Sequence, residues 1–543
     1  MRNLAPAALR GGTALTVPLL LGVWTGETTL AVIAAVGALW GVGQDGGDPY
    51  WARTRRLAWL AGFAALGLLA GEVALRTGVE AVVTVTLVAA GFVSGLVSPY
   101  GRVASVAGMH LLLGAVIGSG IPVPGPWWHA PLALLSGTLL VLVLSAFPWL
   151  WARYEIERSA VRAVYATAAR ALEAAGTPAA EDARRRVTDA LDHAQTVMAP
   201  HLARGSRSGP QTPTGRLVRA FHLAVPLGEA VTTLLWEGRP LPELVTSAPL
   251  RMEQRLFGPG DRAGAPTPRF SPRSPGEQAL AGVCVASGAG PVQDVPLQPP
   301  ARRWSTRAAH LRYAALLALC VLITQLAAVA LDGPRGYWLP MTVAFVYKPD
   351  FGPVFRRSLH RCLGTVAGVA AIGAITLVTG DRYALIAAVA GFGAVMAVGV
   401  RQHYAIATTG LTGVVFVLLD MLGDHRELYW PRILDTALAA LVVLAVHFLL
   451  WPRSAADRAQ ARTADAVAAA QRYRDLAPGA VPAQRHALRR AAYQHLGEAR
   501  RATEEARQEP TRGGRPLPAW EQTITEAEHL CDEVTAQTVK QQA

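Results

Sequence analysis

The sequence predicts an all-α polytopic membrane protein with two parallel six-helix transmembrane halves and a helical cytoplasmic domain. Of its 543 residues, 52% are hydrophobic and 16% are charged, and the charged share lies below the roughly 25% of ordinary soluble proteins. The apolar residues are gathered in runs of roughly 16 to 20, the length of helix that crosses a bilayer. Polar segments follow each of the two groups of runs, which gives the predicted order of the domains.

The predicted membrane halves are residues 1–151 and 310–452. Pro18 and Pro340 fall inside apolar runs and, because proline has no amide donor, are expected to kink those helices. The first apolar run lacks a clear signal-cleavage site and is expected to remain as a span. The expected spans are 11–25, 28–43, 57–75, 81–97, 103–120 and 131–151, then 311–331, 337–348, 361–379, 383–400, 404–420 and 432–451.

The two halves show traces of an internal repeat. Arg55 and Arg361 are 306 positions apart, as are Gly62 and Gly368. Sequence identity between the halves is thin, but the spans keep the same register without gaps, which favours a duplication over chance. Since each unit has an even number of spans, the two halves are expected to face the same way, as a parallel repeat.

The basic residues predict the orientation. Arginines concentrate in alternate loops, for example Arg53, Arg55 and Arg56, and the positive-inside rule places these loops in the cytoplasm. Both termini are then cytoplasmic, and the protein lies in the cell membrane as a multi-pass protein. Topology explains most of the net charge of +13, so no nucleic-acid partner is expected. The outer loops are expected to hold only Arg76, Arg335, Arg382, Arg426 and Arg432.

Two polar segments are expected to pack together as the cytoplasmic domain. Residues 152–309 have helical periodicity at first, then a Pro- and Gly-rich stretch at about 258–300 that predicts a disordered linker. The tail, residues 453–543, predicts three helices near 454–476, 482–508 and 517–540.

The motifs of several enzyme classes are absent from the sequence. It contains no GxxxxGK[ST], HExxH or GxSxG motif, so an ATP-driven pump, a zinc protease and a serine hydrolase are not indicated. The four cysteines form no CxxC pair or cluster with histidine, and no metal site or cofactor is expected. The sequence therefore predicts a protein that is not an enzyme.

The stretch 337–368 is the strongest candidate for a functional site. An apolar run is broken at Lys348-Pro349, a basic loop follows, and a Gly-rich apolar run then leaves. Arginine offers a fork that matches a carboxylate, and lysine a point charge. For Arg356 and Arg357 the alternative is a topological role against anionic lipid headgroups. The candidate substrate-binding residues are Lys348, Arg361, Arg357, Thr365 and Trp338; the helix-break and packing candidates are Pro349, Gly352, Gly364, Gly368 and Pro340.

Ionisable groups inside spans are costly and therefore candidates for function. Glu27 would carry a proton if partial burial raised its pKa. His110 and His447 lie within predicted spans and would relay protons, although a single buried histidine is more often a packing residue. These three residues are the candidates for proton coupling.

The second half resembles the fusaric acid resistance-like (FUSC) family, also called aromatic acid exporters. The resemblance rests on Trp338, Thr342, Pro349, Gly352, Arg361, Gly364, Thr365 and Gly368. The corresponding stretch of the first half departs from the pattern, since Gly43 stands in the place of Pro349. The layout of six spans, a cytoplasmic domain, six spans and a cytoplasmic tail also resembles the family.

The resemblance implies efflux of aromatic and other carboxylic acids, driven by the proton gradient. Plant relatives of the family conduct malate. The expected partners are a small organic anion and the lipid bilayer, and association into a homo-oligomer is left open. Two alternatives remain at this point: an anion channel, and an envelope or scaffold protein that transports nothing.

Overall fold

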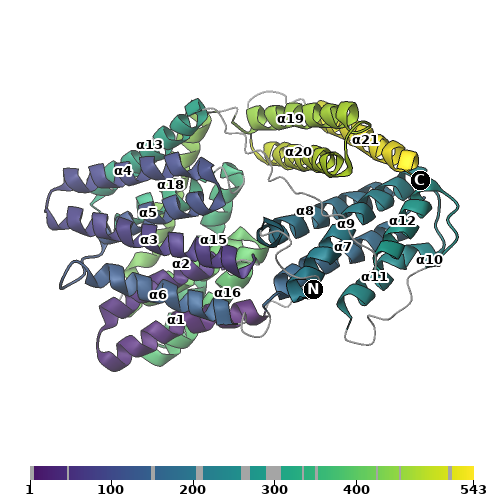
Figure 1. Ribbon diagram of the computed structural model, residues 1–543. Helices are drawn as coiled ribbons and strands as arrows, with labels where there is room; N and C mark the ends of the chain where they lie inside the picture. Colours follow the sequence, from purple (N-terminus) through teal and green to yellow (C-terminus); the bar gives the residue numbers. More distant parts are fainter. Residues whose placement is uncertain are drawn as a thin grey trace. The chain divides into compact units, whose positions relative to one another are not determined.

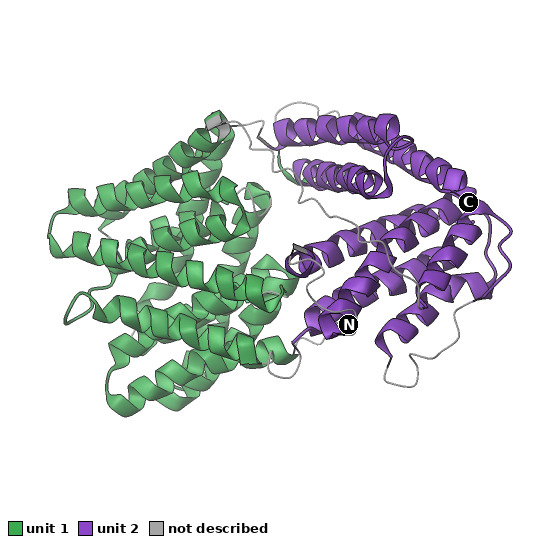
Figure 2. Cartoon of the chain, in the orientation of Figure 1, with its two compact units in different colours: residues 1–151, 303–453, 508–512 green, residues 152–302, 454–507, 513–543 purple. Residues whose placement is uncertain are grey.

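The computed structural model describes residues 5–45, 48–147, 153–203, 212–258, 269–288, 307–332, 335–348, 353–423, 426–451, 454–510 and 517–542. These residues form helices and turns, without a strand among them, so the all-α prediction is confirmed. They divide into two compact units (Figure 2). Unit 1 comprises residues 1–151, 303–453 and 508–512, and unit 2 comprises residues 152–302, 454–507 and 513–543.

Unit 1 is a bundle of apolar helices (Figure 1). Within the described residues, nine of them are long and apolar enough to cross a membrane, while α2 and α17 are apolar but shorter. The helices of the first half are α1 (Ala5–Thr25), α2 (Thr28–Gly43), α3 (Tyr50–Arg76), α4 (Glu80–Val97), the 3-10 turn η1 (Ser98–Tyr100), α5 (Arg102–Gly120) and α6 (His129–Ala146). Those of the second half are α13 (Arg307–Leu331), α14 (Trp338–Val346), α15 (Val354–Val378), α16 (Arg382–Gln402), α17 (Tyr404–Asp420), the 3-10 turn η6 (Arg426–Leu428) and α18 (Tyr429–Leu450).

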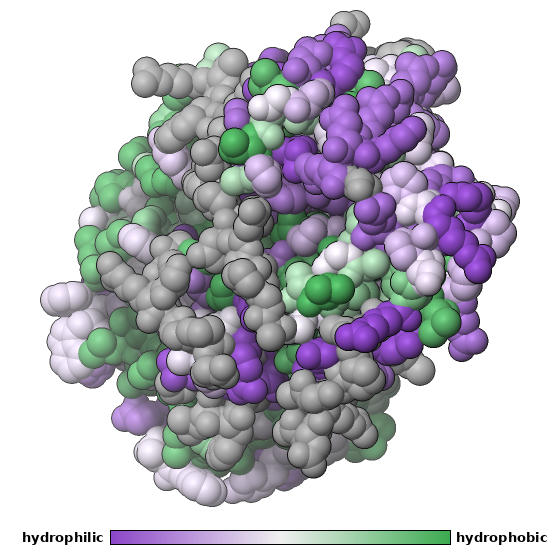
Figure 3. Space-filling view, turned by 45° about the vertical axis from the view of Figure 1, so that its right-hand side comes forward, coloured by the Kyte–Doolittle hydropathy of each residue, from purple (hydrophilic) through white to green (hydrophobic). Residues whose placement is uncertain are grey.

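The outer surface of these helices is apolar, as a lipid-facing surface requires. Large hydrophobic side chains stand exposed on it, and Figure 3 shows hydrophobic residues (green) beside hydrophilic ones (purple) on one face of the chain. In a soluble protein such exposed side chains would be a liability for aggregation, whereas lipid tails solvate them. The most exposed include Leu9, Trp24, Val85, Leu331, Leu377, Val378 and Leu449. The chain is a multi-pass membrane protein.

The same pairs of helices pack together in each half of unit 1. Helix α3 packs on α5 and α15 on α17, and α2 packs on α6 and α14 on α18. Contacts between the halves are reciprocal, because α1 packs on α16 and α13 on α4. A duplicated chain would give this pattern, but the two parallel halves remain a prediction.

Unit 2 joins the middle segment to the tail. Helix α21 packs against both α9 and α19. The three tail helices occur at the predicted positions, within a few residues at each end. The helices are α7 (Glu155–Glu173), α8 (Ala180–Ala203), α9 (Pro213–Glu237), α10 (Glu243–Thr246), α11 (Ala248–Phe257), α12 (Pro275–Ala286), α19 (Ser454–Leu476), α20 (Pro482–Gln508) and α21 (Leu517–Gln542).

The prediction of a disordered linker over 258–300 is wrong for its central part. Helix α12 lies there and packs on α9, with Leu280 and Cys284 fully buried. The side chain of Ser274 accepts a hydrogen bond from the Glu277 amide, and Glu277 in turn accepts one from the Arg273 amide. The first bond is that of a helix N-cap, and the second ties the Glu277 side chain to the residue before the cap. The remaining parts, 259–268 and 289–300, lie outside the described residues.

Buried ion pairs join the middle segment to the tail. Arg184 of α8 lies 3.1 Å from a carboxylate oxygen of Glu528 and 2.9 Å from one of Asp532, both on α21. All three residues are buried. Burial raises the pKa of Asp532, against the opposing effects of Arg184 and of the hydrogen bond from Tyr493. Ionised Asp532 is therefore tolerated in the fold chiefly because Arg184 is beside it.

We expect Arg184→Ala to destabilise unit 2 by about 3 kcal/mol at pH 7, because it leaves the buried carboxylate of Asp532 without its ion-pair partner. Without Arg184 the pKa of Asp532 rises further, so the folded state binds a proton more readily than the unfolded state. The destabilisation should therefore shrink as the pH falls from 7 to 5. Pulse proteolysis of the detergent-solubilised protein in urea measures it. Arg186→Ala, at an exposed neighbouring position, is the control, and equal losses at both positions would contradict the prediction.

Candidate anion-binding site

Helix α14 is too short to cross a membrane. Its nine residues span about 14 Å, roughly half of the hydrocarbon core. Pro340 lies in its first turn, where amides have no helical partner, so this proline starts the helix and does not kink it. Beyond Val346 the backbone leaves the helix, and the Lys348 amide donates to the Val346 carbonyl at 2.9 Å. Pro349 and Gly352, the predicted helix-break residues, lie outside the described residues.

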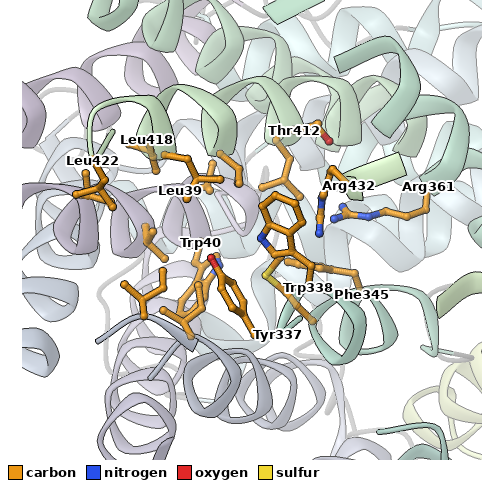
Figure 4. Close-up of a pocket in the computed structure, with 18 residues that line it drawn as sticks. Leu39, Trp40, Tyr337, Trp338, Phe345, Arg361, Thr412, Leu418, Leu422 and Arg432 are labelled. Carbon is orange, nitrogen blue, oxygen red and sulfur yellow. The ribbon is translucent and has the colours of Figure 1, made fainter. Parts of the chain in front are cut away.

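An inner cavity lies beside α14, among α2, α5, α15, α17 and α18 (Figure 4). Its volume is about 50 Å³, which is below the range of about 300 to 1,000 Å³ typical of sites for small molecules, so a ligand would enter only if the walls moved apart. Its wall is apolar and rich in aromatic rings, which come from Trp40, Tyr337, Trp338 and Phe345. A flat apolar ligand of one or two rings would match such a wall.

Two arginines contribute the positive charges in this cavity. Arg361 of α15 is 1% exposed and Arg432 of α18 is 2% exposed. Figure 4 shows their guanidinium groups directed toward one another. The guanidinium of Arg361 lies 4.7 Å from the centre of the Phe345 ring, and that of Arg432 lies 4.9 Å from the centre of the Trp338 ring. Both charges are therefore held against aromatic faces.

The two guanidinium groups keep hydrogen-bond donors unused. Nε and Nη1 of each arginine are buried without a partner, as is the hydroxyl of Thr412 on the same wall. Within the described residues, neither arginine lies within ion-pair distance of a carboxylate. A cation–π contact of a desolvated cation contributes about 2 kcal/mol. Burying an unpaired charge costs several kcal/mol, so the contact does not offset the cost. An anion between the two arginines would supply the missing partner.

Arg432 corrects one sequence prediction. It was expected in an outer loop, but the structure places it in the first turn of α18, with its side chain inside the bundle. Helix α18 begins at Tyr429, earlier than the predicted start of the span at residue 432. A count of loop arginines cannot distinguish a residue in the loop from one that begins a helix and faces inward. An arginine at the start of an apolar run was the available signal.

A larger cavity, which we call the vestibule, adjoins the inner cavity. Its volume is about 340 Å³, and it reaches the surface at the exposed residues Arg401, Gln402 and His403, between α16 and α17. The described residues that line it include four arginines and no acidic residue. The arginines are Arg102, Arg357, Arg361 and Arg401, and the residues shared with the inner cavity are Leu39, Trp40, Phe345, Arg361 and Leu411.

The structure brings only some of the predicted site residues to these cavities. Trp338 and Arg361 line the inner cavity, while Arg357, Arg361 and His110 line the vestibule. Nδ1 of His110 lies 2.7 Å from the Val106 carbonyl, and its ring meets the edge of Trp40. These contacts fix the imidazole in the vestibule wall.

Lys348 lies elsewhere. It is buried, and its ammonium donates to the carbonyl of Ser105 at 2.7 Å and to the hydroxyl of Ser98 at 3.2 Å. It lines neither cavity. These bonds tie the end of α14 to η1 and α5, so in this structure Lys348 joins the two halves of unit 1.

The remaining candidates also lie outside both cavities. Thr365 is buried one turn beyond Arg361, and His447 is buried with Nδ1 3.4 Å from the hydroxyl of Tyr347. Glu27 is exposed at the start of α2, so the expectation of partial burial is wrong. Gly364 and Gly368 lie where α15 meets α17, and a Cβ atom at either would come within 2.6 Å of α17.

Among the described residues of the first half, no two buried arginines form a counterpart to the arginine pair. Arg55, the predicted counterpart of Arg361, is exposed. The buried arginines of α3 are paired instead: Arg53 with Asp45 at 3.2 Å, and Arg56 with Asp48. Asp45 also binds Arg10 at 2.8 Å. Buried positive charge is thus neutralised by carboxylates in the first half and left available in the second.

A family model matches the segment of the chain that carries this site. Residues 315–446 match the family model described as fusaric acid resistance protein-like. The second half carries a fusaric acid resistance protein-like domain. Trp338, Arg361 and Arg432 all lie inside the matched segment, which agrees with the resemblance expected from the sequence. The family is one of membrane proteins with a transporter-like role.

The chain is also similar to two Escherichia coli (strain K12) proteins. It is 30% identical to the uncharacterized protein YhfK over 166 residues, 29% of this chain and 23% of that protein. It is 28% identical to the inner membrane protein YccS over 153 residues, 28% of this chain and 21% of that protein. The matches therefore span between a fifth and a quarter of these relatives. No solved structure matches the chain.

Proposed function

We propose that the protein is a secondary transporter that exports organic anions, with aromatic carboxylic acids as the substrate class and the proton gradient as the energy source. The observation that carries this proposal is the pair of buried arginines, Arg361 and Arg432, whose donors are unused beside a wall of aromatic rings. A carboxylate with an apolar body fits the arginine pair through its charge and the aromatic wall through its body.

The chemistry of binding follows from these residues. A carboxylate accepts hydrogen bonds from a guanidinium in a forked geometry, and such charge-assisted bonds contribute about 1.5 to 3 kcal/mol each. The apolar body of the ligand would lie against Trp338 and Trp40. In the low dielectric of the cavity, binding an anion also relieves the repulsion between the two arginines.

The vestibule would supply the anion to this site. Its arginines create a positive potential that raises the local concentration of anions. On the predicted topology this end of the bundle faces the cytoplasm, so the direction of transport would be outward. Of the three candidates for proton coupling, His110 is the one that lines either of the two cavities.

Proteoliposomes test the proposal. Purified protein is reconstituted, and the uptake of radiolabelled benzoate and succinate is measured with a pH gradient and, separately, with a membrane potential alone. We expect benzoate flux that requires the pH gradient and exceeds succinate flux. Flux that follows the potential without a pH gradient would identify an anion channel. The absence of flux for every anion would favour a scaffold role and contradict the proposal.

A further inference from the structure

Phe345 forms part of the wall between the two cavities. It is one of five residues that line both the vestibule and the inner cavity. Its ring lies under the guanidinium of Arg361, at 4.7 Å, and Figure 4 shows it at the arginine end of the inner cavity. An anion that moves from the vestibule into the inner cavity passes between these five residues, and the Phe345 ring lies on that route against Arg361.

The backbone at Phe345 is held by side chains where a helix would hold it by its own amides. A helix that continued would bond the Phe345 carbonyl to the amide four residues later, but that residue is Pro349, which has no N–H. The Phe345 carbonyl instead accepts a hydrogen bond from Nε of Arg357 at 2.7 Å, and a longer one from the hydroxyl of Tyr404 at 3.5 Å. The position of Phe345 thus depends on Arg357.

Arg357 belongs to the vestibule. It lines that cavity, and its guanidinium lies 4.4 Å from the centre of the Tyr404 ring. A carboxylate is a stronger acceptor for a guanidinium than a neutral carbonyl is. An anion that binds in the vestibule therefore competes with the Phe345 carbonyl for Arg357. When the anion takes Arg357, the hydrogen bond that holds the Phe345 backbone is lost.

We infer that Phe345 selects which anions pass from the vestibule to the inner cavity, and that an anion bound at Arg357 releases it. The ring sets the largest ligand that passes, and Arg357 makes passage depend on negative charge. This inference rests on the proposed function, because it concerns the route to the same arginine pair. It assigns a role to a residue that does not itself bind the carboxylate.

Transport by size-altered variants is the first test. Phe345→Ala should raise the uptake of 1-naphthoate, a two-ring acid, about tenfold relative to benzoate, while Phe345→Leu, which keeps most of the volume, changes the ratio less. Met396→Ala, at a residue that lines only the vestibule, is the matched control. An unchanged ratio in Phe345→Ala, with benzoate still transported, would overturn the inference and leave the proposed function standing.

Chemical labelling is the second test, and it needs no transport. Leu418 lines only the inner cavity, and Leu418→Cys is made in a chain whose four native cysteines are replaced by serine. The label is a charged methanethiosulfonate reagent. We expect slow labelling, which benzoate accelerates severalfold, and fast labelling without benzoate when Phe345→Ala is added. Arg357→Met should remove the acceleration by benzoate.

The outcomes of the two tests are separable. A reconstituted protein that moves no anion contradicts the proposed function, and the labelling rates still decide whether Phe345 controls access to the inner cavity. Equal labelling rates with and without the Phe345 ring would overturn the inference whatever the transport result. Folding of each variant is checked by its elution as a single species in detergent.

Discussion

Replacement of either buried arginine should greatly weaken binding of an aromatic carboxylate. For Arg432→Gln and Arg361→Gln we expect benzoate affinity to fall by about 100-fold, equivalent to about 3 kcal/mol, because each variant loses a charge-assisted fork to the carboxylate. Quenching of tryptophan fluorescence measures the affinity, since Trp338 and Trp40 line the cavity. Arg382→Gln, at an exposed arginine at the start of α16, is the control and should bind normally.

The stability of the empty protein separates a binding role from a structural one. Arg432 has unused donors and no carboxylate within ion-pair distance in the described chain, so its charge is a cost to the fold. Replacing such a charge by an apolar residue of similar size is often neutral or stabilising by about 1 to 4 kcal/mol. Arg432→Met should therefore unfold no lower than the wild type while binding no benzoate. A large loss of stability would show that Arg432 serves the fold.

The second large effect is expected at Gly368. A Cβ atom there would lie 2.6 Å from Cβ of Thr412 and 2.8 Å from the carbonyl of Thr409, so α15 and α17 could not keep their present separation. We expect Gly368→Val to cost more than about 3 kcal/mol, since overpacking is typically worth 1 to 3 and backbone contact adds to it. Yield of monodisperse protein in detergent and its unfolding temperature measure the effect.

A control for Gly368→Val is available in the neighbouring helix. Gly391 of α16 has nothing within 4 Å of its Cβ position, so Gly391→Val should leave yield and unfolding temperature nearly unchanged. The two variants carry the same substitution and differ in the atoms that surround the new side chain. Similar behaviour of the two variants would mean that the contact of α15 with α17 does not limit the fold, and the position assigned to Arg361 would lose its support.

The sequence predicts where helix α14 ends, but it does not predict which side chains bond the carbonyl groups at that end. Pro349 is visible in the sequence and predicts that the helix breaks there. Which group then takes the Phe345 carbonyl depends on the positions of Arg357, 12 residues later, and Tyr404, 59 residues later. The sequence predicts Arg357 in a basic loop, either as a ligand for an anion or as a topological residue against lipid headgroups. Its hydrogen bond to the Phe345 carbonyl, beside the vestibule, favours the role in anion binding.

Lys348 and Arg361 show how far local pattern reasoning extends. Both were chosen because a charged residue stands at the end of an apolar run. One faces the hydroxyl and carbonyl groups of Ser98 and Ser105, and the other faces an apolar cavity. Both positions end an apolar run, so the packing of the helices distinguishes the two roles.

The sequence by itself determined the helices, the two polar segments and the resemblance to the family, because the length of an apolar run and the helical period are properties of a local stretch of chain. The tertiary structure alone decided that Arg361 and Arg432 share one cavity, that the buried arginines of α3 are paired with carboxylates, and that Phe345 lines both cavities. Burial and charge pairing depend on which helices face each other, and residues 361 and 432 meet only after α15 and α18 pack together.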